Sequence, residues 1–358
     1  MKKAFFIRLA SRRSKRETAA RWVAGLLTLV VFAGADADAP RVAIAPPAGS
    51  SNVFGGEPVE FPFVVTSAEA VRGRAGWVVS IDRRTIARGE QDLSVDPGRP
   101  APIVIRWDVP PARDGIVVEA RLSAVFDGVT RDVPLWIFPR DPFAGRVRGP
   151  GMPKLVLFDP ERTTAPILEG MGLSFTSVRG SDAFEGLTDC VLVVGEGTSL
   201  DEFRGLADRL VQTAERGLTV LCLAPSAARF PLPGAEGVNG ARPPSLCLRG
   251  REVIRQLDKR LETRSWPPDG RVIASTIALT SERERVVGTV SPGPGSGGWP
   301  WFEAEYPESR GRLIVCGFAI VRHWESGPTP RYLFARILES ITEKNEDSAR
   351  EILNAPRP

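Results

Sequence analysis

The second half of the chain is organised by residues 190–223, which read CVLVVGEGTSLDEFRGLADRLVQTAERGLTVLCL. Two continuous apolar runs, Cys190–Gly195 and Leu218–Leu223, stand at the ends of this stretch. Between them, apolar residues recur every three or four positions across Ser199–Arg216, which is the period of an amphipathic helix. Apolar strands that alternate with helices are typical of a parallel sheet covered on both faces. The stretch therefore predicts an α/β fold.

Three features place the start and end of the helix in this stretch. Ser199 and Glu202 have the spacing of a capping box, in which two side chains satisfy backbone N–H groups of the first turn. Six apolar residues between Phe203 and Ala214 fall on one face. Gly217 suits the position after the last turn, where many helices end in a left-handed residue. We expect the helix to begin at Ser199.

The alternation of strands and helices continues on both sides of this stretch. A final helix is expected from Thr329, its N-cap, with Pro330 in the first turn. Two further helices are expected at Thr164–Met171 and Glu252–Glu262. The other expected strands are Lys154–Phe158, Ser174–Val178, Val272–Leu279, Arg285–Val290, Trp301–Tyr306 and Leu313–Phe318.

Residues 41–138 have a different pattern, of short β-rich runs without a helical period. Turn residues separate these runs, for example Asp96-Pro97-Gly98 and Asp127-Gly128. Short strands at this spacing predict a β-sandwich of about 100 residues. The expected strands are Val42–Ala45, Val59–Val65, Gly76–Asp82, Ile103–Val109, Val117–Phe126 and Val133–Phe138.

A segment rich in proline, glycine and arginine separates the two patterns and is predicted to be a linker. The chain is therefore expected to be multidomain. The expected parts are a signal peptide (1–37), a β-sandwich (41–138), the linker (139–153), an α/β domain (154–344) and a tail (345–358).

The N-terminus has the order of a secretory signal, with a basic segment, an apolar segment and a small-residue cleavage site. Residues 1–21 are basic, Trp22–Ala35 is apolar, and Ala35-Asp36-Ala37 fits the cleavage site. The apolar run has 14 residues, fewer than the roughly 20 that span a bilayer as a helix. We expect export to the periplasm, the cell envelope or the medium. Anchoring by an uncleaved N-terminal segment is the alternative.

The net charge of +4 comes from this N-terminal segment. Residues 1–37 hold eight basic and two acidic residues, and their removal leaves 39 basic and 41 acidic ones. A chain with this balance gives no electrostatic reason to expect nucleic-acid binding. With 42% hydrophobic and 25% charged residues, the composition is globular and excludes a disordered or fibrous protein.

The sequence offers little for metal or cofactor chemistry. Its cysteines, at positions 190, 222, 247 and 316, match no zinc-binding spacing, and His323 is the single histidine. There is no Walker A motif, no G-x-S-x-G, and no G-x-G-x-x-G between a strand and a helix. We therefore expect neither a metal nor a cofactor.

Two families resemble parts of the chain. Trp77 with Ser80-Ile81-Asp82 and Ile86-Ala87-Arg88-Gly89 resembles the immunoglobulin-like (Ig-like) sandwich modules of family 2 glycoside hydrolases. The order LVLFDP, VLVVGEG, ERGLTVLCL, RGRLIVCGF and PTPRYLFARIL resembles the class I glutamine amidotransferase-like domain, a flavodoxin-like fold. The resemblance is greatest to its non-catalytic members, such as the β-galactosidase trimerisation domain. It implies an Ig-like sandwich followed by a flavodoxin-like domain with a mainly parallel sheet, in a carbohydrate-related setting.

Four carboxylates follow the expected strands of the α/β half. Asp159 and Glu161 come after the first strand, and Glu196 and Asp201 come after the third. Ligands bind at the carboxyl ends of strands in open α/β sheets, where two neighbouring carboxylates can act as acid and base. A structural role is the alternative, because Asp159 can stabilise a turn and Asp201 suits the positive end of a helix dipole. The sequence leaves both open.

The amidotransferase resemblance also implies a place for a catalytic cysteine. Those enzymes carry a G-x-C-x-G elbow and a late H-x-E motif, which here correspond to Val220–Ala224, with Cys222 at its centre, and to His323-Trp324-Glu325. Both elbow glycines are replaced, and Val220 suits a regular strand better than a strained turn. We expect Cys222 to be a buried, inert thiol. A catalytic site of Cys222, His323 and Glu325 is the alternative.

The function expected from the sequence is that of an exported, non-enzymatic binding or scaffold protein of the cell envelope, linked to glycan metabolism. Its partner would be a protein or a glycan. The alternative is a cysteine-dependent hydrolase or amidase that uses Cys222 and His323. The sequence leaves open whether the chain forms a homo-oligomer, and contact with a membrane is expected only if the N-terminal segment is uncleaved.

Overall fold

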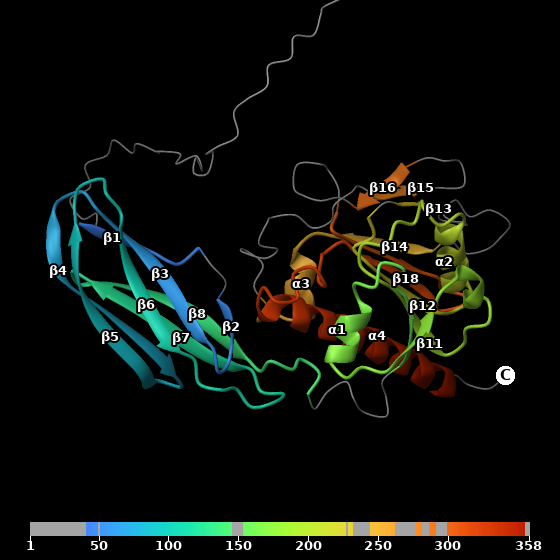
Figure 1. Cartoon of the computed structure of the whole chain (residues 1–358), viewed down its shortest axis with the longest axis horizontal. Helices are drawn as coiled ribbons and strands as arrows, with labels where there is room; N and C mark the ends of the chain where they lie inside the picture. The colour runs from blue at the N-terminus through green and yellow to red at the C-terminus, as the bar shows by residue number, and fades with distance from the viewer. Residues whose placement is uncertain are drawn as a thin grey trace, which may run out of the picture. The chain divides into compact units, whose positions relative to one another are not determined.

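The fold was analysed in a computed structural model of the chain (Figure 1). It describes residues 41–48, 51–144, 153–226, 228–231, 244–261, 277–280, 286–290 and 299–354. The predicted signal peptide and residues 145–152 of the predicted linker lie outside these ranges. Within them, no helix combines the length and the apolar character needed to cross a membrane. The described chain is mostly β-sheet with few helices.

The first half of the described chain forms two sheets that share one buried core. The smaller sheet has the order β1-β3-β6 and the larger the order β2-β8-β7-β4-β5. Phe63 and Ile105 of the smaller sheet and Val79 and Ala124 of the larger are fully buried in this core. The strands are β1 (Val42–Ala45), β2 (Asn52–Phe54), β3 (Pro58–Ser67), β4 (Val71–Ile81), β5 (Arg84–Val95), β6 (Ala101–Asp108), β7 (Val118–Phe126) and β8 (Val129–Phe138).

The six strands predicted in this half correspond to β1, β3, β4, β6, β7 and β8, whereas β2 and β5 were missed. Strand β5 lies at the edge of its sheet, and most of its residues are polar. Only its apolar residues Leu93 and Val95 are buried, so the strand shows little alternation of apolar and polar residues. It is joined to β4 by Asp82 and Arg83, which both have positive φ. Positive φ at both residues is typical of the two-residue hairpin turn whose twist matches that of the flanking strands. Such turns usually contain Asn-Gly, whereas this one contains Asp-Arg.

A side chain connects the edges of the two sheets. Gln91 of β5 accepts a hydrogen bond from the backbone N–H of Val104 in β6, at 3.1 Å, and donates one to the carbonyl of Pro102, at 3.0 Å. Its amide therefore replaces the peptide group of a neighbouring strand. An unpaired strand edge must otherwise be hydrated or covered, and Gln91 pairs the edge of β6 at Pro102 and Val104.

The second half is built on a mixed seven-stranded sheet with the order β10-β9-β11-β12-β18-β17-β14. Strands β10, β9, β11, β12 and β18 are parallel, β17 runs antiparallel to β18, and β14 runs antiparallel to β17. Every residue of β11, β12 and β18 is buried. The strands are β9 (Lys154–Phe158), β10 (Phe175–Val178), β11 (Cys190–Val194), β12 (Thr219–Leu223), β14 (Ser245–Arg249), β17 (Trp301–Glu305) and β18 (Arg312–Cys316).

Short helices and a small extra sheet complete this half. The sheet has the order β13-β15-β16, with strands Ala228–Pro231, Ile277–Thr280 and Val286–Val290. The predicted strands and helices of this half are present, most of them with shifted ends, whereas β13, β14 and a short 3-10 helix were missed. Residues 272–276 of the predicted strand Val272–Leu279 lie outside the described ranges. The helices are α1 (Ala165–Gly170), the 3-10 helix η1 (Ser181–Phe184), α2 (Leu206–Glu215), α3 (Glu252–Leu257) and α4 (Pro328–Asn354).

The predicted start of the long helix at Ser199 is wrong. Ser199 forms an isolated β-bridge, and residues 200–205 form turns and a bend. Helix α2 begins at Leu206, after Gly205 with φ of +72°. Phe203 packs edge-on against Phe158, with ring centroids 5.4 Å apart. This contact and the left-handed Gly205 turn the chain before the helix starts. Ser199 and Glu202 therefore do not form the predicted capping box.

The last helix begins one residue before the predicted cap and extends beyond the predicted domain end. Helix α4 starts at Pro328 and runs to Asn354, so most of the predicted tail, residues 345–358, is helical. Its buried residues include Leu333, Ile337 and Leu338, which belong to the same apolar cluster as the central strands.

Hydrogen bonds and apolar packing connect residues of the two halves. The Asn52 side chain donates a hydrogen bond to the carbonyl of Arg260 at 2.8 Å. The Tyr332 hydroxyl donates one to the carbonyl of Pro139 at 3.0 Å. Phe143, in the predicted linker, is fully buried in the apolar cluster of the second half.

One glycine of this half is needed for close backbone packing. A Cβ on Gly311 would lie 1.6 Å from the carbonyl oxygen of Ala214 in α2. We expect Gly311→Ala to lower the free energy of unfolding by about 2–3 kcal/mol or more, because backbone atoms would have to move apart. Gly186→Ala is the matched control, since nothing lies within 4 Å of its Cβ position. Urea denaturation of both variants is the measurement, and equal stability would contradict the packing argument.

Candidate functional site at the carboxyl edge of the seven-stranded sheet

The carboxyl ends of β9, β11, β12 and β18 meet at one edge of the sheet, because these strands are parallel neighbours. The strand order reverses between β9 and β11, since the chain passes from β9 to β10 on one side and then returns to β11 on the other. Such a point is the usual ligand site of an open α/β sheet. Asp159 follows β9 there, and Glu196 follows β11 two residues after its end.

Asp159 is held by the start of the next helix. Its Oδ2 accepts hydrogen bonds from the backbone N–H groups of Thr164, at 2.9 Å, and Ala165, at 2.8 Å. Its Oδ1 accepts a longer hydrogen bond from the backbone N–H of Thr163, at 3.3 Å. These are donors that a helix start leaves without an internal partner. Asp159 thus caps α1, and both of its oxygens are in use.

Glu196 is the centre of the hydrogen bonding at this edge. Its side chain is 7% exposed. Oε2 accepts from the backbone N–H of Val321 at 2.6 Å, and Oε1 accepts from that of Arg322 at 2.9 Å. Its own N–H donates to the Thr164 hydroxyl at 2.9 Å, and its carbonyl accepts from the Thr163 hydroxyl at 2.7 Å. Glu196 therefore connects the loops that follow β9, β11 and β18.

The environment of Glu196 favours its neutral form. Burial raises the pKa of the carboxyl from its usual value of 4.5 to about 7, and the N–H groups of Arg322 and Val321 and the charge of Arg322 only partly oppose this. A carboxyl with such a pKa can exchange a proton near neutral pH. Its two oxygens, however, are bound to backbone N–H groups inside the protein.

The other two predicted carboxylates do not share this arrangement. Glu161 and Asp201 are exposed, Glu161 in the turn after β9 and Asp201 in the turns before α2. The structure thus brings Asp159 and Glu196 to one hydrogen-bonded edge and leaves Glu161 and Asp201 at the surface. Sequence analysis missed Thr163, Thr164 and the N–H groups of Val321 and Arg322, because backbone donors carry no sequence signal.

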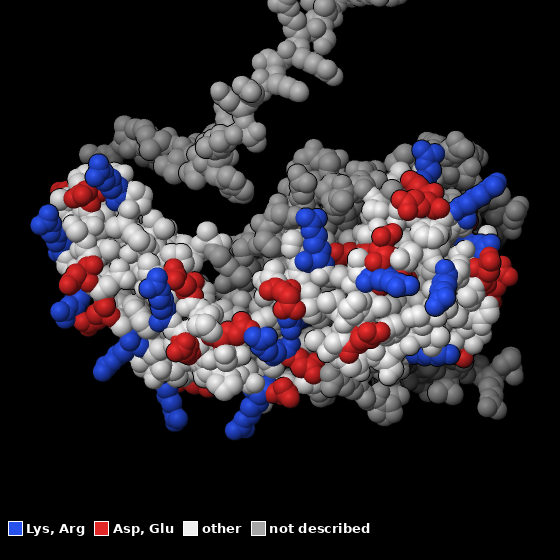
Figure 2. Space-filling model, in the orientation of Figure 1, with Lys and Arg blue, Asp and Glu red and all other residues white. Residues whose placement is uncertain are grey.

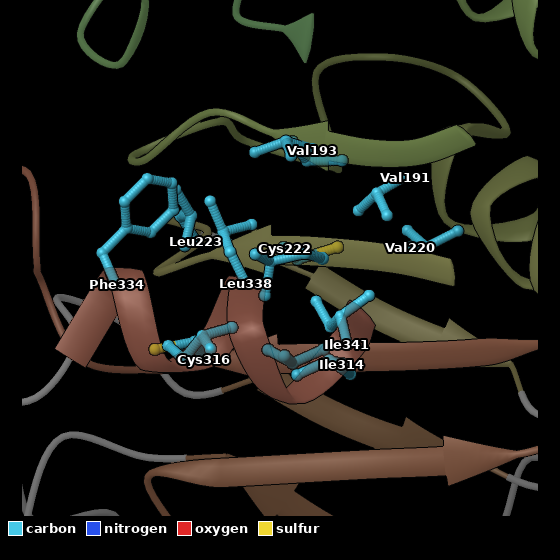
Figure 3. Close-up of a cluster of buried hydrophobic side chains, with 14 of the residues drawn as sticks. Val191, Val193, Val220, Cys222, Leu223, Ile314, Cys316, Phe334, Leu338 and Ile341 are labelled. Carbon is cyan, nitrogen blue, oxygen red and sulfur yellow. The ribbon is translucent and has the colours of Figure 1, made fainter. Parts of the chain in front are cut away.

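Cys222 lies inside a regular strand. It is fully buried in β12, and Figure 3 shows it in a cluster with Val220, Ile314 and Leu338. Burial raises the pKa of its thiol far above the usual value. The residue with positive φ at the end of this strand is Ala224, with φ of +30°. The positive φ at this strand end therefore lies at an alanine, two residues after the cysteine.

His323 and Glu325 lie in the loop between β18 and α4. The backbone N–H of His323 donates to the carbonyl of Ala319 at 3.2 Å, within a series of turns, and its side chain is half-buried. Glu325 is exposed and pairs with Arg331 at the start of α4. The side chain of Glu325 is thus directed to the helix start. Within the described ranges no group of three His, Cys, Asp or Glu side chains is placed to hold a metal ion.

A polar recess lies elsewhere, on the outer face of β4, β7 and β8. Basic and acidic side chains are interspersed on the face of the molecule drawn in Figure 2, and the recess has the same mixture. Arg121 and Asp132 form an ion pair in it at 3.4 Å, exposed to solvent and hence weak. Its volume is about 780 Å³, and its polar lining residues are Ser80, Asp82, Arg83, Glu119, Arg121 and Asp132.

Comparison with known proteins adds little. No family model and no curated protein matches the chain. Among solved structures, a DNA glycosylase AlkC from Pseudomonas fluorescens matches at 11% identity over 27% of this chain and 30% of its own, with a TM-score of 0.23. A Paenibacillus cycloisomaltooligosaccharide glucanotransferase matches at 8% identity, over 52% of this chain and 27% of its own, with a TM-score of 0.24.

The sporulation control protein Spo0M of Bacillus subtilis matches at 15% identity, over 28% of this chain and 48% of its own, with a TM-score of 0.20. The chain spans between 15% and 30% of the length of the first three matched structures. Scores this low carry no argument about fold or function.

The capping role of Asp159 can be measured. We expect Asp159→Ala to lower the free energy of unfolding by about 1–2 kcal/mol, because the backbone donors of α1 lose their acceptor. Glu161→Ala, two residues away and exposed, is expected to change it by less than about 0.5 kcal/mol. Denaturant unfolding of the two variants compares them directly. A loss in Glu161→Ala as large as that in Asp159→Ala would argue against a specific cap.

Proposed function

We propose that this chain is an exported, non-enzymatic binding or scaffold protein of the cell envelope, whose partner is a protein or a glycan. The observation that carries the proposal is the structure at the end of β12. Cys222 is buried one residue before the end of β12, and Ala224, which has no reactive side chain, follows the strand with positive φ. A nucleophile elbow needs its nucleophile exposed at that strained turn.

The use of the strand-end carboxylates supports the same proposal. Asp159 and Glu196 accept hydrogen bonds from backbone N–H groups on all four of their side-chain oxygens. A general acid or base must reach the proton of a substrate directly or through one water. These two carboxyls instead stabilise loops, as expected for a domain that binds without catalysis.

The finer architecture is part of the proposal. We assign the second half to the flavodoxin-like, amidotransferase-like class, because its parallel strands follow in the order 2-1-3-4-5 when numbered along the chain from β9, with the late β18 as the fifth. We assign the first half to the Ig-like sandwiches, because two mainly antiparallel sheets share its core.

A cysteine-dependent hydrolase or amidase remains the alternative, and the thiol decides between the two. At pH 7 we expect Cys222 to react with a maleimide only when the protein unfolds, because a buried thiol forms little thiolate. Cys247 of β14 is half-buried and is the internal control that should react first. The measurement is labelling of the full chain followed by peptide mass spectrometry. The proposal would be overturned if Cys222 is labelled rapidly in the folded state and the protein has an amidase activity that Cys222→Ser abolishes along with the labelling.

Export has its own test. We expect N-terminal sequencing of the protein from the producing cell to find a mature start between Asp36 and Pro40, after the predicted cleavage site. Recovery of a chain that begins at Met1 or Lys2, in the membrane fraction, would favour the anchored alternative. Recovery of that chain from the cytosol would contradict export.

A further inference from the structure

Strand β14 forms one edge of the seven-stranded sheet. It pairs antiparallel with β17 from Ser245, opposite Glu305, to Arg249, opposite Trp301, without a shift of register. Within the described ranges no strand pairs with its other side. Alternate residues of β14 therefore direct their backbone N–H and C=O groups away from the sheet, where a further strand can bind them.

The composition of β14 does little to protect this edge. Edge strands usually carry proline, lysine, a bulge or several charges, which hinder pairing with another chain. Strand β14 reads Ser-Leu-Cys-Leu-Arg, and its one charged residue, Arg249, stands at its end. The edge strand β5 of the first half, by contrast, carries Arg88, Glu90 and Asp92. Strand β14 is thus an edge on which a second strand meets no obstacle of this kind.

The apolar face of the sheet continues onto β14. Leu246 and Leu248 lie opposite Ala304 and Phe302 of β17, which are both fully buried. Leu246 is nevertheless 41% exposed. At the other edge of the sheet, the exposed residues of β10 are a threonine and a serine. Apolar surface therefore reaches solvent at β14 and not at β10.

This edge can pair with the same edge of a second copy. Residues that lie opposite one another in an antiparallel pair point to the same face, and two-fold symmetry makes the pairing reciprocal. One residue must then lie on the axis, opposite its own copy. With Cys247 on the axis all five residues of β14 pair, Leu246 with Leu248 of the second copy and Ser245 with Arg249 of the second copy.

The same register brings opposite charges together. Arg249 lies opposite Ser245 of the second copy, and within each copy Ser245 lies opposite Glu305. Neighbouring strands are about 4.8 Å apart, so the backbones of Arg249 and of Glu305 in the second copy lie roughly 10 Å apart. An arginine and a glutamate side chain together span this distance across the small serine. The Glu305 side chain is 44% exposed, with its carboxylate 3.6 Å from Nε of Arg312.

We propose that β14 pairs antiparallel with β14 of a second copy about a two-fold axis at Cys247, which joins two seven-stranded sheets into one. The dimer covers Leu246 with Leu248 of the second copy and forms an ion pair between Arg249 and Glu305 on each side of the axis. The reciprocal fit of apolar to apolar and of basic to acidic residues is the reason that the partner is a second copy. The dimer goes beyond the proposed binding or scaffold function and depends neither on export nor on the absence of catalysis.

Analytical ultracentrifugation of the full chain over a range of concentrations tests the dimer. We expect a reversible equilibrium between one and two copies. Leu246→Asp should raise the dissociation constant by about 100-fold or more, because it places a carboxylate in the apolar strip on both sides of the axis. Ile86→Asp is the matched control, since Ile86 is 40% exposed on the edge strand β5 and should not affect the dimer. Circular dichroism checks that both variants fold.

A charge exchange tests the register. Arg249→Glu and Glu305→Arg should each raise the dissociation constant by about 10-fold or more, because each variant alone brings like charges together across the axis. A mixture of the two variants should recover dimers that contain one copy of each, since both ion pairs then join opposite charges. Arg88→Glu, an equal change of charge on β5, should neither weaken the dimer nor associate preferentially with Glu305→Arg.

Cys247 reports the same register by cross-linking. Opposite residues of an antiparallel pair have Cα atoms about 4.5–5.5 Å apart, which is within the range of disulfides. Oxidation of the dimer by copper phenanthroline in air should therefore join two copies through Cys247, as identified by peptide mass spectrometry. Cys247→Ser should remove the cross-link and keep the non-covalent dimer.

Three results would each overturn the proposal. The first is a monomer at every concentration, and the second is a dimer that Ile86→Asp dissociates and Leu246→Asp does not. The third is a dimer that oxidation does not link through Cys247. If Leu246→Asp does not fold, the cross-link in the wild-type chain and the charge exchange decide. An amidase activity or recovery from the cytosol would contradict the proposed function and leave this dimer unaffected.

Discussion

The second half of the molecule depends on a sheet that is apolar on both faces. Every side chain of β11, β12 and β18 is buried, so the sheet can exist only where other elements exclude water from both sides. Buried residues of α2 and α4 meet this requirement, as Leu210 and Val211 in one and Leu333 and Leu338 in the other belong to the same cluster. Polar chemistry is then confined to the ends of the strands.

At those ends, the first demand on polar side chains comes from the protein itself. Each loop that leaves a buried strand carries backbone N–H groups that need acceptors. Asp159 supplies acceptors for the start of α1, and Glu196 does so for the loop before α4. The same position in the fold thus serves either a ligand or the loops, and here the loops use both carboxylates.

The sequence was sufficient for much of this arrangement. Continuous apolar runs identified β9, β11, β12 and β18 within a residue or two, because burial on both faces leaves a direct compositional signal. The polar edge strand β5 and the three-residue β2 left none. The start of α2 was misplaced because the contact between Phe203 and Phe158 and the left-handed Gly205 outweigh a local capping pattern. Asp159 and Glu196 were identified as strand-end residues, but the partners of Glu196 are backbone groups 125 positions away, and only the folded chain brings them together.

The bridge made by Gln91 has a consequence for behaviour at high protein concentration. Strand edges of β proteins can recruit edges of other molecules, which is how sheets grow into aggregates. On β6 the N–H of Val104 and the carbonyl of Pro102 are already bonded to an amide that cannot dissociate from the chain. A second molecule would have to displace that tethered amide before its own strand could add. The glutamine thus hinders strand addition at the Pro102–Val104 part of this edge.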